Sequence, residues 1–141
     1  MNFKATIVDA INDALKKQKI GIYDLSKKTG ITAVNLYRVV KGENFSMLTL
    51  DKIIRVLDLK LTLTTKDNVS LQLDKENLIA TPRIAGIAID KVKENKVTAK
   101  AIAFKADISA LTLAKLLTYK NVTIDVMSRV LEVVGVTITN A

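Results

Sequence analysis

The amino-acid sequence repeats at a spacing of 77 residues, and this repeat constrains the fold more than any other feature. A repeat of this length indicates that one structural unit was used twice. Without a gap, several residues of the first half recur 77 positions later: Ile7, Asp13, Lys16, Lys19, Ile31, Ala33, Leu36, Asn44, Val56 and Thr62. Because the identity is low, the repeat depends on the pattern of helix starts that accompanies it.

Three helix-start units recur at the same spacing. In each, a capping position lies between an apolar residue before the helix and another inside its first turn, an arrangement that satisfies free backbone N–H groups and fixes the entry of the chain. The paired cap positions are Gly21 and Thr98, Thr32 and Ser109, and Ser46 and Thr123. We therefore expect the two repeats to contain matching helices.

Apolar residues at helical spacing predict four helices in each repeat. In the first they span about residues 4–18, 22–29, 33–41 and 47–58; in the second, about 83–95, 99–106, 110–118 and 124–134, with Gly135 as the left-handed cap of the last. Alternating leucines then predict a β-hairpin over residues 59–73. A lone hairpin is only marginally stable, so we expect the strand containing Val136 and Ile138 to join it, either within the chain or between two chains.

The predicted fold is mainly α: two helix-turn-helix bundles of four helices each, with a small β-hairpin and strand element after the first bundle and at the C-terminus. The expected domains are residues 1–58, the hairpin 59–73, a linker 74–82, and a divergent second repeat over 83–141 with its terminal strand. The hairpin carries many apolar residues, which favours self-association as a homodimer.

Composition limits the function. The chain has 22 Lys and Arg against 14 Asp and Glu, and both halves are equally basic, with 12 basic and 8 acidic residues in 1–74 and 10 and 6 in 75–141. An evenly basic chain favours a polyanionic partner such as nucleic acid, although ordinary solubilising charge is the alternative. The absence of Cys and His removes thiolate nucleophiles, imidazole bases and the usual zinc ligands. We expect no enzyme activity, no cofactor and no metal, and a cytoplasmic protein without a signal peptide.

The first repeat resembles the Cro and phage-repressor (XRE) type of helix-turn-helix domain. Residues that carry the resemblance are the small Ser26, the turn residue Gly30, the cap Thr32, Gly42, and the apolar positions Leu25, Ile31, Leu36, Val39, Leu50, Ile53, Ile54 and Leu57. The resemblance implies that the helix at about 33–41 enters the major groove of DNA while the preceding helix lies across the phosphate backbone.

This resemblance assigns roles to the outward residues of the first repeat. Base readers are expected among Ala33, Val34, Asn35 and Arg38, and phosphate contacts among Lys19, Tyr23, Thr32, Tyr37, Lys41 and Asn44. The second repeat departs from the pattern, because Asp107 replaces Gly30 and Tyr119 replaces Gly42. Its possible DNA contacts are Lys100, Thr112, Lys115 and Lys120.

Two interpretations stay open from the sequence. The protein is expected to be a sequence-specific transcriptional regulator that binds double-stranded DNA, or else a protein-binding regulator, of the antitoxin or anti-repressor type, that uses the same fold for docking. Two DNA geometries are also open: one chain reads two unlike half-sites as a covalent pseudo-dimer, or a true dimer reads a palindrome.

Overall fold

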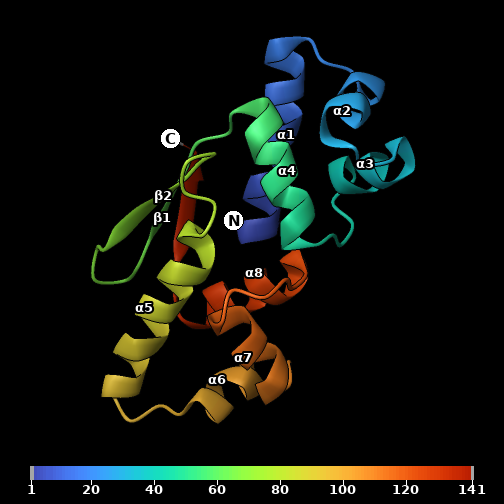
Figure 1. Cartoon of the computed structure of the whole chain (residues 1–141). Coiled ribbons are helices and arrows are strands. Elements are labelled where there is room, and N and C mark those ends of the chain that lie inside the picture. Colours follow the sequence, from blue (N-terminus) through green and yellow to red (C-terminus); the bar gives the residue numbers. More distant parts are fainter. Residues whose placement is uncertain (1, 141) are drawn as a thin grey trace.

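The computed structural model describes residues 2–140 and is mainly helical, with one small antiparallel sheet (Figure 1). The predicted fold class is confirmed at that level. The elements are α1 (Phe3–Gln18), α2 (Ile22–Thr29), α3 (Ala33–Val40), α4 (Met47–Leu57), β1 (Leu61–Thr64), β2 (Ser70–Leu73), α5 (Ala80–Glu94), α6 (Ala99–Lys105), α7 (Ala110–Leu117), α8 (Ile124–Val133) and β3 (Thr137–Asn140).

The helices begin at matching positions in the two halves of the chain, which we define as residues 3–64 and 80–140. Each of α5 to α8 begins 77 residues after its counterpart among α1 to α4. Side-chain caps predicted from the sequence are present, since Thr32 accepts from the Asn35 N–H and Ser109 from the Thr112 N–H. Matching starts follow from matching caps because the capping side chain fixes where the first helical turn begins.

One predicted helix start is wrong. The sequence places the beginning of the fifth helix at residue 83, whereas α5 begins at Ala80. Ile79 precedes the helix without a side-chain cap, so no local signal marks the start. Pro82 lies inside the first turn, where its missing N–H costs no helical hydrogen bond.

The backbone repeats at the same spacing even where the residue types differ. Positive φ angles occur at Lys19 and Lys96, at Asp58 and Gly135, at Gly30 and Asp107, and at Gly42 and Tyr119, and each pair is 77 residues apart. Replacement of Gly30 and Gly42 in the second half therefore leaves the left-handed turns in place.

The two halves meet where α4 and α8 begin, and Figure 1 shows these two helices close together. The contacts between them are related by a pseudo-two-fold axis. Ser46 pairs with Thr123, its own counterpart in the repeat. The Met47 N–H donates to the Val122 carbonyl at 2.8 Å, and the matching Ile124 N–H donates to the Phe45 carbonyl at 2.7 Å. Each of these two backbone bonds thus has its counterpart on the other side of the axis.

Two asparagines extend this symmetric contact. The Asn121 Oδ1 accepts from the Leu48 N–H at 3.0 Å, and the Asn44 Oδ1 accepts from the Asp125 N–H at 3.1 Å. Each side chain therefore satisfies a free N–H in the first turn of the opposite half's helix.

The sheet provides a second point on the same axis. Its strand order is β2-β1-β3, with β1 antiparallel to both neighbours. Thr62 lies opposite Thr139, again its own counterpart, while Leu61 opposite Asn140 mirrors Leu63 opposite Ile138. The strand predicted around Val136 and Ile138 therefore joins the hairpin within one chain.

The hairpin is not left uncovered, which corrects the argument for self-association. Strand β3 pairs with its open edge and α5 packs on β1 and β2, so that Leu61, Leu63 and Leu73 are at most 1% exposed. One hydrophobic core runs through both halves. No helix within residues 2–140 is long and apolar enough to span a membrane.

Candidate nucleic-acid interface

The turn between α2 and α3 is built by short side chains and one left-handed residue. Gly30, at φ +76°, ends α2. The Ser26 Oγ donates to the Ile31 carbonyl at 2.6 Å, and the Thr29 Oγ1 accepts from the Ile31 N–H at 3.2 Å. These bonds fix the direction in which α3 leaves the turn.

Helix α3 is anchored at its inner face and at its end. Leu36 and Val39 are buried in the core. The Asn12 side chain of α1 donates to the Val40 carbonyl, in the last turn of α3, and to the Val8 carbonyl, both at 3.2 Å. Sequence reasoning missed Asn12, because a polar residue on an amphipathic helix carries no signal of its tertiary partner.

The outer face of α3 carries the predicted base readers. Asn35 and Arg38 are exposed, Val34 is 63% exposed, and Ala33 is half-buried. Tyr37 is 44% exposed, and Lys41 and Thr32 are also exposed, although the Thr32 hydroxyl is used as the cap of α3. The structure therefore brings these residues together on one surface, which we call the α3 face.

The α3 face is cationic. Helix α3 contains no acidic residue, and within residues 2–140 neither Arg38 nor Lys41 forms an ion pair. Lys19 and Tyr23 are exposed beside the start of α2, where Asp24 adds one negative charge. Free cations on a fixed helix surface can bind phosphate or base edges.

Asn44 is placed differently from the other predicted phosphate contacts. Its Oδ1 accepts from the Asp125 N–H at the contact between the halves. The role in phosphate binding stays a prediction, whereas the role in joining the halves is an observation that sequence analysis missed.

The corresponding surface of the second half is more apolar. Lys100, Lys115 and Lys120 are exposed and form no ion pair within the described residues. Thr112 is half-buried, and its hydroxyl lies 2.9 Å from the Ser109 Oγ in the cap of α7. Leu111 is 67% exposed at the position of Val34, and Phe104 is 85% exposed at the position that holds Lys27 in the first half.

Comparison with known proteins bears on the first half. Residues 10–62 match the family model of the Cro/C1-type HTH DNA-binding domain. The matched segment extends from within α1 to β1 and contains the whole α3 face. No curated protein and no solved structure matches the chain.

The Cro/C1-type match agrees with the resemblance found in the sequence, and it supports DNA binding by a helix-turn-helix. It ends at residue 62, so it does not extend to the second half.

Proposed function

We propose that this protein is a sequence-specific regulator of transcription that reads the major groove of double-stranded DNA with α3. The observation that carries the proposal is the acid-free, exposed α3 face within the segment that matches the Cro/C1-type HTH domain. In such a fold the second helix of the motif presents its outer residues to the base edges.

The residue types on the α3 face fit distinct parts of DNA. Arg38 is suited to a bidentate pair with guanine and Asn35 to adenine, while Ala33 and Val34 are suited to thymine methyl groups. The proposed phosphate contacts are Lys19, Tyr23, Thr32, Tyr37, Lys41 and Asn44, which set the register of the protein on the duplex.

The test is selection of bound sites from random duplex DNA, followed by titration of the selected site with Arg38→Ala. We expect this variant to lose about 1–3 kcal/mol of specific binding free energy without a change in melting temperature. Arg83→Ala is the matched control, because Arg83 is an exposed arginine of α5, outside the matched segment. Equal affinity of Arg38→Ala and the control would remove the proposed role of Arg38.

The pseudo-two-fold axis supports a geometry in which one chain covers two half-sites. The six-residue connections 41–46 and 118–123 lead from α3 and α7 to the same axis, and six residues span at most about 20 Å. The ends of α3 and α7 therefore lie close enough to the axis for the two helices to enter successive major grooves, which are about 34 Å apart. In this arrangement Lys100, Lys115 and Lys120 meet phosphates, and the two half-sites are unlike.

This geometry replaces the homodimer as our proposal, because the apolar hairpin that favoured dimerisation is covered within one chain. We expect one chain per duplex by light scattering of the complex. Lys115→Ala should weaken binding equally for all sequences and lower the slope of log affinity against log salt by about one. Lys93→Ala, an exposed lysine of α5, is the control. A complex with two chains and a palindromic selected site would contradict the single-chain geometry.

Protein docking is the second candidate, favoured by the exposed Phe104 and Leu111 of the second half. Exposed apolar side chains of this size occur at protein-binding surfaces. Random duplex DNA whose migration is unchanged at low salt, together with a stoichiometric protein complex, would favour docking over DNA binding. Retardation that weakens steeply with salt would favour DNA binding.

A further inference from the structure

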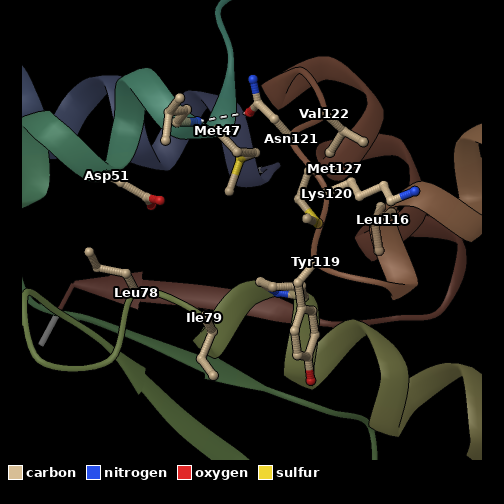
Figure 2. Close-up of a pocket in the computed structure, with 12 residues that line it drawn as sticks. Met47, Asp51, Leu78, Ile79, Leu116, Tyr119, Lys120, Asn121, Val122 and Met127 are labelled. Carbon is tan, nitrogen blue, oxygen red and sulfur yellow. Dashed lines mark hydrogen bonds between the residues drawn. The ribbon is translucent and has the colours of Figure 1, made fainter.

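A cavity of about 130 Å³ lies beside the pseudo-two-fold axis and is lined by both halves of the chain (Figure 2). Met47 and Asp51 of α4 form one wall, while Leu116, Tyr119 and Met127 of the second half form another. The lining is mostly apolar, and among the described residues its charged members are Asp51 and Lys120. A mostly apolar cavity with a small number of polar or charged groups is typical of small-molecule sites.

The Asp51 carboxylate has no partner of its own. In Figure 2 it points toward the open space of the cavity. Within residues 2–140 it forms neither an ion pair nor a hydrogen bond. Burial raises the pKa of Asp51 to about 6, and the nearby charge of Arg55 opposes this shift only in part. Lys120 also lines the cavity, but its ammonium ends on the side away from Asp51 (Figure 2).

On the other side of the axis, the contact between the halves contains an ion pair. There the Lys4 ammonium lies 2.9 Å from an Asp125 carboxylate oxygen, and the Lys4 N–H donates to the Ser128 Oγ at 3.4 Å. A shift of 77 residues turns Lys4 into Thr81, Asp125 into Leu48 and Ser128 into Asp51, so neither member of the ion pair has a charged counterpart. The cavity side has therefore gained an acid where the other side has a serine, and it has no lysine at the position of Lys4.

The side chain of Thr81, on the cavity side, also lacks a polar partner. Thr81 is fully buried, and its hydroxyl has no hydrogen-bond partner within residues 2–140. Its neighbour Pro82 lines the cavity. A buried hydroxyl without a partner is uncommon in folded proteins, so this side of the molecule is incomplete in polar contacts where the other side is paired.

We propose that the cavity binds a small organic cation, a primary ammonium carried on a compact apolar frame. The ammonium pairs with the Asp51 carboxylate, which forms no ion pair within residues 2–140. The apolar frame contacts Met47, Leu116 and Met127. The frame is no larger than a single ring, since a dry cavity of about 150 Å³ is known to hold benzene.

Binding in this cavity is expected to tie the two halves together, because the ligand contacts both. A ligand that binds only the folded state stabilises it by RT ln(1 + [L]/Kd), so the melting temperature should rise with ligand concentration. This inference concerns ligand binding and does not depend on the proposed DNA function.

Benzylamine is the probe, with benzyl alcohol as its neutral analogue and phenylacetate as its anionic one. Each is titrated into the full chain at about pH 7.5, where the carboxylate is ionised, and followed by backbone amide shifts. We expect benzylamine to saturate with a Kd on the order of 1 mM, a value that suits a ligand of this size. Its shifts should cluster at residues 47–51 and 116–127. Benzyl alcohol should bind at least about fivefold more weakly, because it lacks the charge that pairs with Asp51.

Asp51→Asn is the matched variant, since it keeps the shape of the side chain and removes its charge. This variant should lower the affinity for benzylamine at least about fivefold, because it removes the charge-assisted bond. Asp9→Asn, an exposed acid of α1, should leave the affinity unchanged. The proposal is overturned by shifts that do not saturate or lie elsewhere, by equal binding of benzylamine and benzyl alcohol, or by an unaltered affinity in Asp51→Asn. The comparison of the three probes on the unaltered chain decides the question even if a variant does not fold.

Discussion

At the scale of single residues, the turn between the second and third helices has glycine in the first half of the chain and aspartate in the second. Gly30 has φ +76° and Asp107, its counterpart, has φ +56°. A left-handed backbone is free of strain for glycine and costs energy for most other residues, with Asp and Asn the better tolerated. The left-handed conformation therefore causes less backbone strain at Gly30 than at Asp107.

Substitutions at this pair should have opposite signs. A Cβ at Gly30 would meet no atom within 4 Å, so Gly30→Ala should lower the free energy of unfolding by about 1 kcal/mol through backbone strain alone. Asp107→Gly should change it by less, and in the favourable direction. Urea denaturation followed by circular dichroism measures both, and an unchanged midpoint for Gly30→Ala would contradict the argument.

Asp51 should make the stability of the protein depend on pH. Burial raises its pKa in the folded state from 3.8 to about 6, so between these values the folded chain binds more protons than the unfolded chain. The free energy of unfolding should therefore fall as pH rises through this range and stay lower above it. Asp51→Asn should remove this loss and stabilise the protein at neutral pH by about 1 kcal/mol, a value reduced for solvent screening.

Urea midpoints of the unaltered chain and of Asp51→Asn, taken between pH 4 and 7, test this assignment. The two curves should diverge as the pH rises. Asp9→Asn should follow the unaltered chain, since Asp9 is exposed. Parallel curves for Asp51→Asn would mean that this carboxyl titrates normally.

At the scale of elements, the sequence predicts what local chemistry decides. The starts of α3 and α7 follow from caps that bond within four residues, and the outer face of α3 follows from helical periodicity. The start of α5 was misplaced because Ile79 supplies no side-chain cap, although the 77-residue spacing from the start of α1 marks it. The pairing of β3 with the hairpin was predicted, but the covering of the hairpin by α5 was missed, because only the tertiary arrangement packs this helix on β1 and β2.

The candidate sites divide in the same way. The outward position of Arg38 could be read from the sequence, whereas the bond of Asn12 to Val40 spans 28 residues and that of Asn44 to Asp125 spans 81. The cavity at Asp51 could not be read from the sequence. It depends on a difference between the two sides of the pseudo-two-fold axis, and no single segment of the chain contains both sides.

The loops before α4 and α8 give a prediction at this scale. Asn44→Ala and Asn121→Ala each remove one bond between the halves and leave an N–H in a first helical turn without its cap. Each should lower the free energy of unfolding by about 1 kcal/mol. Asn95→Ala, whose side chain makes no hydrogen bond within the described residues, is the control. Losses no greater than that of the control would show that these asparagines do not join the halves.

At the scale of the whole molecule, the contact between the halves is self-complementary. Ser46 and Thr123, and Thr62 and Thr139, are pairs of counterparts that face each other on one axis. A surface with this property can also join two identical copies, because each residue finds its own equivalent opposite it. The covering of the sheet obeys the same relation, since α5 packs on β1 as α1 packs on β3.

The first half alone should therefore form a homodimer that the full chain does not need. In a fragment of residues 1–74, Ser46 would face Ser46 and Thr62 would face Thr62 of the other copy, with Asn44 accepting from the opposite Leu48 N–H. An undimerised fragment would expose Leu61 and Leu63, so it should unfold on dilution. Sedimentation and thermal melts across concentration measure this, because the melting temperature of a dimer depends on concentration and that of a monomer does not. The full chain should show no such dependence, and a fragment that stays folded as a monomer would contradict the symmetry of the contact.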